Sequence, residues 1–74
     1  MVYILYKLRY LCHEPTLSAT SKMIKDLIYQ NDWKYYSDGH LGIYGMILAP
    51  EKDFKDFLIT YDYLFKDINV SKID

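Results

Sequence analysis

Apolar and polar residues alternate along the first segment of the chain, and this pattern restricts the fold more than any other feature. Residues 2–13 read VYILYKLRYLCH. Because neighbouring side chains of a β-strand point to opposite faces, this segment predicts a strand with one apolar face and one mixed face. The apolar face holds Val2, Ile4, Tyr6, Leu8, Tyr10 and Cys12, and the mixed face holds Tyr3, Leu5, Lys7, Arg9, Leu11 and His13.

A helix is predicted after this strand. Pro15 ends the strand, because it lacks an N–H donor and restricts the backbone of the residue before it. Thr16 or Ser18 can cap a helix that runs to about Gln30. The apolar residues recur on one stripe of that helix, namely Leu17, Thr20, Ile24, Leu27 and Ile28, with Met23 at its edge. The segment therefore predicts an amphipathic helix.

Two more strands follow, joined by a tight turn. Residues 33–37 read WKYYS and predict the first of them. Asp38 and Gly39 predict a hairpin turn, because a type I′ turn needs positive φ and glycine adopts it without steric cost. Residues 41–49 are apolar on both faces, which is typical of a strand in the middle of a sheet.

A second helix and a short tail complete the chain. Pro50 suits the first position of a helix, and an apolar period then continues to about Asp67. The residues on this period are Phe54, Phe57, Leu58, Tyr61, Leu64 and Phe65. The tail, residues 68–74, alternates weakly, so it predicts either a short edge strand or a frayed end.

The order of these elements predicts an α+β fold. Strand, helix, strand, strand and helix, closed by a final strand if the tail pairs, is typical of a small two-layer sandwich of ferredoxin-like type. Two helices then pack on one face of an antiparallel or mixed sheet whose first and third strands are central. Gly45 would let a helix approach the sheet closely. A chain of 74 residues forms one domain, 1–74. The alternative is a three-stranded sheet whose tail is disordered or pairs with another chain.

The composition excludes several kinds of protein. One cysteine, Cys12, allows neither an internal disulfide nor a cysteine-based zinc site, and it fits a cytoplasmic location. No segment approaches the ~20 apolar residues of a membrane span, so we expect no membrane partner. The formal net charge of −1 gives no overall attraction to nucleic acid. Nine tyrosines exceed what a small core hides, although an AT-rich coding bias also favours tyrosine.

No group of residues predicts catalysis. Cys12, His13, Asp38 and His40 could imitate a metal or nucleophile site, but they end the first strand and begin the third. If those strands are parallel, the two pairs lie ~30 Å apart at about 3.3 Å per residue. The carboxylates of the second helix alternate with lysines, which is typical of a solvated face. We therefore expect no enzyme activity, metal site, cofactor or small-molecule substrate.

The glycines do not predict a nucleotide-binding loop. Gly39, Gly42 and Gly45 run from a turn into a strand. A phosphate-binding loop instead places its glycines before the amino end of a helix, where free N–H groups meet the anion.

The second side of the predicted sheet is a candidate binding surface. If both helices cover one side, the other exposes Tyr3, Leu5, Lys7, Arg9, Tyr36, Tyr44, Met46 and Leu48, with Leu11 and Lys34 beside them. Aromatic residues and methionine rimmed by basic residues are typical of protein interfaces. Ile59 and Tyr63, four apart on the second helix, are either a smaller second patch or ordinary exposed residues.

The same surface resembles that of an RNA-recognition-motif domain over two short segments. In that family, aromatic residues on the two central strands stack RNA bases. VYILYKL at 2–8 is similar to the motif of the first strand, with Tyr3 at its aromatic position, and YGMIL at 44–48 is similar to part of the motif of the third strand. Met46 and Ala49 stand where that motif has aromatic residues. The resemblance implies binding of single-stranded RNA.

Two functions are therefore expected. The first is a non-catalytic protein-interaction module, a small cytoplasmic regulator or inhibitor from a phage or other mobile element, which forms a homo-oligomer or binds a larger protein partner. The second is binding of single-stranded nucleic acid (RNA) through the tyrosines of the same face. The sequence does not separate a homodimer from a heteromeric inhibitor.

Overall fold

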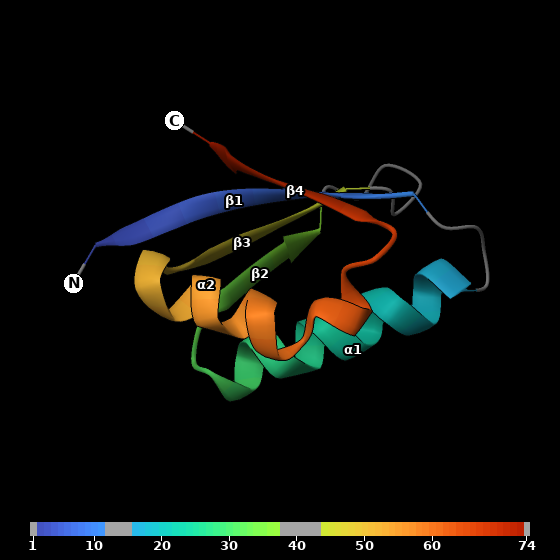
Figure 1. Ribbon diagram of the computed structural model, residues 1–74, viewed down its shortest axis with the longest axis horizontal. Coiled ribbons are helices and arrows are strands. Elements are labelled where there is room, and N and C mark those ends of the chain that lie inside the picture. Colours follow the sequence, from blue (N-terminus) through green and yellow to red (C-terminus); the bar gives the residue numbers. More distant parts are fainter. Residues whose placement is uncertain (1, 12–15, 38–43, 74) are drawn as a thin grey trace.

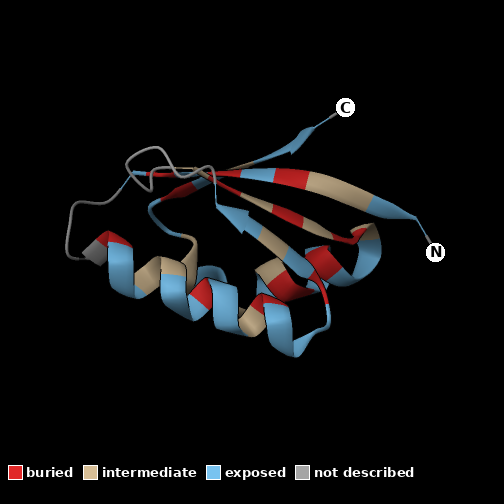
Figure 2. Ribbon diagram, turned by 180° about the vertical axis from the view of Figure 1, so that it is seen from behind, coloured by how far each residue is buried: buried red, intermediate tan, exposed pale blue. Residues whose placement is uncertain are grey.

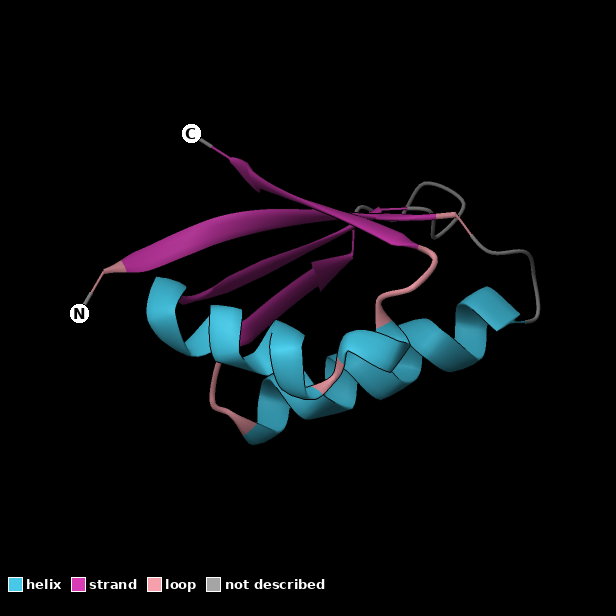
Figure 3. Cartoon of the chain, viewed as in Figure 1, coloured by secondary structure: helices cyan, strands magenta, loops and turns pink. Residues whose placement is uncertain are grey.

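The chain folds into one layer of strands and one layer of helices, as a computed structural model describes for residues 2–11, 16–37 and 44–73 (Figure 1). In chain order the elements are β1 (Tyr3–Tyr10), α1 (Thr16–Gln30), β2 (Lys34–Ser37), β3 (Tyr44–Pro50), α2 (Glu51–Thr60), the 3₁₀ helix η1 (Asp62–Leu64) and β4 (Ile68–Ile73). Both α-helices lie on the same side of the sheet (Figure 3). The predicted α+β sandwich of ferredoxin-like type is confirmed.

The sheet has the strand order β2-β3-β1-β4, and each neighbouring pair is antiparallel. The strands β1 and β3 are central, as the apolar character of residues 41–49 predicts. The edge strand β4 pairs with β1, so the tail forms a strand of this sheet. Of the two alternatives for the tail, the edge strand is therefore correct for residues 68–73.

The central strands β1 and β3 run antiparallel, so the distance argument against a metal or nucleophile site, which assumed parallel strands, is wrong. A crossover through α1 sets β1 and β2 parallel, and β3 returns against both. Arg9 near the end of β1 consequently lies opposite Tyr44 at the start of β3. Cys12, His13, Asp38 and His40 lie outside the described residues, as does the predicted turn at 38–39. Among the described residues, no three His, Cys, Asp or Glu side chains gather where they could hold a metal ion.

The core lies between the sheet and the helices, where the buried residues of both layers meet (Figure 2). Its members are Tyr6, Leu8, Tyr10, Leu17, Ile24, Ile28, Trp33, Ile47, Ala49, Phe54, Phe57 and Ile68. Aromatic rings form its centre, with the ring of Phe54 4.2 Å from that of Tyr6 and the ring of Trp33 5.5 Å from that of Phe57. Full burial of one such side chain contributes about 1.5–3 kcal/mol. The alternation from Ile4 to Tyr10 and the stripe along α1 therefore predict their parts of this core correctly. Val2, expected on the same apolar face, is instead 71% exposed.

A local backbone motif ends α1 and directs the chain into β2. The N–H of Trp33 donates to the carbonyl of Ile28 at 3.1 Å, and the N–H of Asp32 donates to that of Tyr29 at 3.0 Å. This pair of bonds is a Schellman motif, which needs a left-handed residue before its last donor. Asp32 takes that conformation, with φ of 63°. The turn places the Trp33 ring in the core, where it is 8% exposed.

The helix α2 is shorter than the sequence predicts. The apolar period continues to Phe65, but α2 ends at Thr60 and η1 follows it. A helix to Asp67 would carry the chain past the sheet, whereas β4 has to begin at Ile68 beside β1. Tyr61 and Phe65 still pack against the core, so the apolar period is preserved without a continuous helix. Neither described helix is long and apolar enough to cross a membrane.

A side chain from a neighbouring strand, and not a helix, lies against Gly45. A Cβ atom at this position would be 2.5 Å from the hydroxyl oxygen of Tyr35. The Tyr35 side chain crosses β3 above the glycine and forms a hydrogen bond of 2.7 Å with the hydroxyl group of Tyr10 on β1. The expected close approach of a helix to Gly45 is therefore wrong. The space left by the missing side chain is occupied by the Tyr35 ring instead.

Candidate interaction surface on the open face of the sheet

The described helices cover one face of the sheet and leave the other uncovered (Figures 1 and 3). We call the residues of the uncovered side the open face. The register places there Tyr3, Leu5, Lys7 and Arg9 of β1, Lys34 and Tyr36 of β2, Tyr44, Met46, Leu48 and Pro50 of β3, and Asn69, Ser71 and Ile73 of β4. All eight sheet residues that the sequence suggests for a binding surface lie on it. Their part in binding stays a prediction.

Aliphatic side chains cross one half of the open face in a row. Leu5 of β1 lies opposite Leu48 of β3 on one side and Ile73 of β4 on the other. Tyr3, the first residue of β1, extends the apolar surface towards the start of that strand, and its side chain is 51% exposed. Ile73, which is 37% exposed, was missed from the sequence because the pairing of the tail was uncertain. The alternation in INVSKI was the signal that could have found it.

Basic and aromatic side chains occupy the other half of the open face. Lys7 lies opposite Met46, and Arg9 lies opposite Tyr44. The ammonium nitrogen of Lys7 is 4.5 Å from the centroid of the Tyr44 ring. A cation this close to a ring face is attracted by the electrons of the ring. Tyr36 of β2 lies opposite Met46 and is 44% exposed.

The charged side chains that the structure describes on the open face are all basic. Its described residues include Lys7, Arg9 and Lys34, and none of them is Asp or Glu. The helix layer instead mixes both signs, as in the sequence EKDFKD at the start of α2. A protein of net charge −1 therefore presents a basic surface on one side.

An ion pair joins the two layers on the helix side of the sheet. The ammonium group of Lys72 in β4 donates to the carboxylate of Glu51 at the start of α2, at 2.6 Å. This hydrogen bond and the charge of Lys72 hold the pKa of Glu51 below its ordinary value. Because alternate residues of β4 face opposite sides, Lys72 marks the helix side and its neighbour Ile73 marks the open face.

The second patch suggested by the sequence is not a helical pair. Ile59 belongs to α2, whereas Tyr63 belongs to η1. The expected placement of both residues on one helix is therefore wrong. The two side chains are 75% and 59% exposed. The ring of Tyr63 lies 6.3 Å from that of Tyr61. Both residues belong to the helix layer, so they do not extend the open face.

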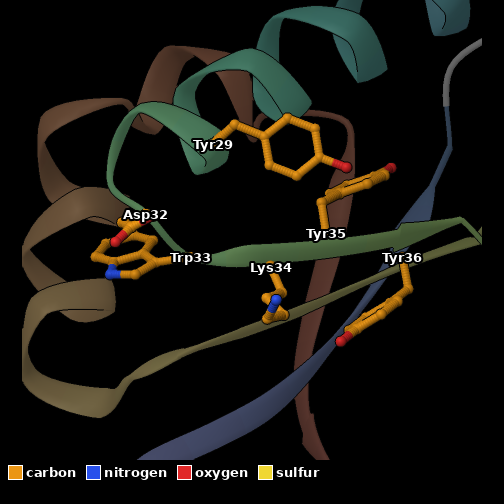
Figure 4. A pocket seen from close by; sticks show the side chains of 6 residues that line it. All are labelled: Tyr29, Asp32, Trp33, Lys34, Tyr35 and Tyr36. Atoms are coloured by element: carbon orange, nitrogen blue, oxygen red, sulfur yellow. The ribbon is translucent and has the colours of Figure 1, made fainter.

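A shallow hollow of about 340 Å³ lies at the outer edge of β2. Tyr29 at the end of α1, Asp32, Trp33 and the β2 residues Lys34, Tyr35 and Tyr36 line it (Figure 4). The Tyr29 ring extends from α1 towards Tyr35, which lies on the helix side of β2, whereas Lys34 and Tyr36 project to the other side of the strand. Burial raises the pKa of the Tyr35 hydroxyl above its ordinary value. The sequence did not reveal this hollow, because its walls meet only after α1 and β2 pack together.

Comparison with known proteins identifies no relative. No family model, curated protein or solved structure matches the chain. Any function must therefore be argued from the arrangement of the residues themselves.

Proposed function

We propose that this chain is a non-catalytic interaction module, a small regulator or inhibitor that docks onto another protein with its open face. The observation that carries the proposal is the apolar and aromatic surface of the two central strands, which no described helix covers. Soluble monomers seldom leave a large contiguous apolar patch exposed, and aromatic residues, methionine and arginine are enriched at protein interfaces. We place this activity in the cytoplasm, and small regulators of this kind are expected from phages and other mobile elements.

Substitution of Met46 by Glu tests this proposal. Met46 lies in the middle of the open face, so a buried carboxylate there should weaken docking at least about tenfold, or about 1.4 kcal/mol. The immobilised chain is exposed to an extract of its own host, and the retained proteins are identified by mass spectrometry. Their affinity for the purified chain is then measured by calorimetry.

Met23 provides a matched control for that substitution. It is a methionine on α1 with 49% of its side chain exposed, and α1 lies in the other layer. A partner should be retained by the wild type and by Met23→Glu and lost with Met46→Glu. A partner lost equally with both variants, or with neither, would contradict the proposal.

A second candidate function is binding of single-stranded nucleic acid. It is supported by Lys7, Arg9 and Lys34 on a face without described carboxylates, and by the tyrosines beside them. Sites for single strands combine such cations with aromatic rings on which bases stack. This function requires oligonucleotide binding that falls steeply with salt and weakens in the Lys7→Ala/Arg9→Ala variant. Binding that is undetectable at low salt would exclude it.

A further inference from the structure

The positions of the basic side chains on the open face indicate which kind of partner this face can bind. Lys7 and Arg9 lie on β1, which has β3 on one side and β4 on the other. Lys7 is two residues from Leu5 on the same face, and Arg9 is two residues further, near the end of the strand. A partner that covers the apolar row of Leu5, Leu48 and Ile73 therefore also covers Lys7 and borders on Arg9. The partner must therefore supply acceptors for buried cations as well as apolar contacts.

A second copy of this chain does not meet that requirement. In a symmetric dimer formed by two open faces, the cations of each copy lie against the open face of the other. That face contains no described Asp or Glu, so Lys7 and Arg9 of both copies would be buried without a described carboxylate partner. Burial of a charge that is left unpaired is strongly unfavourable. Self-association through this face is therefore disfavoured.

A single-stranded nucleic acid meets the charge requirement but not the shape of the face. The Lys7 ammonium group already lies over the Tyr44 ring, so a base cannot stack there without displacing it. Tyr3 lies six positions along β1 from Arg9, the partner of Tyr44, a span of about 20 Å at ~3.3 Å per residue. The apolar row separates Tyr3 from Tyr44, so Tyr36 is the described ring beside the cations on which a base could stack freely. A site for a single strand instead offers several rings to successive bases.

We infer that the open face binds a different protein through a surface on which carboxylates border an apolar patch. This inference rests on the proposed function and names the partner chemistry of the same surface. The carboxylates accept hydrogen bonds from Lys7 and Arg9, and the apolar patch packs on Leu5, Leu48 and Ile73. The inferred assembly is therefore a heteromeric complex and not a homodimer.

The first test is the mass of the chain in solution. Sedimentation equilibrium over a range of protein concentrations should give the monomer mass of 8.9 kDa at low and at high salt. A dimer that is lost in the Met46→Glu variant would overturn the inference of a different partner. The open face would then still be a protein interface, as the proposed function requires. This outcome would therefore contradict the inferred acidic partner without contradicting the use of the open face for protein binding.

The second test uses defined probes and observes backbone amide signals by NMR. One probe is a short amphipathic peptide with leucine on one face and glutamate on the other, the second has lysine in place of glutamate, and the third is oligouridine. The acidic peptide should shift the signals of β1 and β3 in a saturable way and bind most tightly. In the Lys7→Glu/Arg9→Glu variant its affinity should fall about tenfold or more.

A control variant and two opposite outcomes complete this test. Lys22→Glu/Lys25→Glu makes the same charge change on exposed residues of α1, and its affinity for the acidic peptide should stay within about twofold of the wild type. Tighter binding of the lysine peptide, or binding of neither peptide, would overturn the inference. Tighter binding of oligouridine, lost with Lys7→Glu/Arg9→Glu, would overturn both the inference and the proposed protein partner.

Discussion

At the scale of single residues, a glycine and a tyrosine on adjacent strands fit together as one unit. Gly45 leaves a gap on the helix side of β3, and the Tyr35 ring fills this gap. The hydroxyl group of Tyr35 forms a hydrogen bond with the hydroxyl group of Tyr10. The ring shields the glycine backbone and links the edge strand β2 to the central strand β1 across β3. This contact adds to the pairing of β2 with β3, and because Tyr35 faces the helices, its neighbour Tyr36 lies on the open face.

Substitution of Gly45 by Ala should destabilise the protein by about 1–3 kcal/mol, because the new Cβ would lie 2.5 Å from the Tyr35 hydroxyl oxygen. Urea unfolding followed by circular dichroism measures this loss. In the Tyr35→Phe background the same substitution should cost less, since the nearest clashing atom is gone. An equal loss in both backgrounds would show that the contact with the Tyr35 hydroxyl group is not the cause.

At the scale of elements, the edge strand β4 completes both layers. Its residue Ile68 lies in the core and is 7% exposed, whereas Ile73 lies on the open face at 37%. Lys72 between them pairs with Glu51 of α2 on the helix side. The strand therefore closes the core beside β1 and also extends the candidate binding surface.

Matched substitutions at the two isoleucines of β4 test this double role. Ile68→Ala should lower the free energy of unfolding by about 2–4 kcal/mol, because it leaves a cavity in the core. Ile73→Ala should change it by less than about 0.5 kcal/mol but should weaken binding at the open face. Denaturant unfolding of both variants gives the comparison. Equal, small losses would mean that β4 does not pack as described.

At the scale of the whole molecule, hydroxyl groups within a largely apolar core link stability to pH. The hydroxyl group of Tyr6 is buried and has no hydrogen-bond partner among the described residues. Burial, with a smaller effect from Glu51, raises the pKa of Tyr6, and burial also raises the pKa of Tyr35. The folded state therefore holds these two protons more tightly than the unfolded state does.

The free energy of unfolding should consequently fall in alkaline solution. The stability contributed by the protonated hydroxyl groups is fully present below the unfolded pKa of about 10, and it is lost as the pH rises through the higher folded pKa values. Thermal unfolding between neutral and strongly alkaline pH measures this decline. Tyr6→Phe should make the decline shallower, and Tyr63→Phe, at an exposed position, controls for the loss of a hydroxyl group. An unchanged profile in Tyr6→Phe would refute this explanation.

Much of the fold and of the candidate surface could be predicted from the sequence, because side-chain direction along a strand or helix is a local property. The alternation in residues 2–10 separates the core side of β1 from the open face, and the stripe from Leu17 to Ile28 gives the buried side of α1. Alternation along β3 likewise places Tyr44 and Met46 together on one face of that strand. These assignments need no knowledge of any distant contact.

Only the tertiary structure decided how these faces combine, because pairing and packing depend on residues far apart in the chain. The antiparallel direction of β1 and β3, the early end of α2 and the contact between Tyr35 and Gly45 all result from such contacts. The contact of the Lys7 ammonium group with the Tyr44 ring has the same origin, since β1 and β3 meet only in the folded sheet. The sequence alone determined which residues face outward, and the alignment of the strands determined what surface they make.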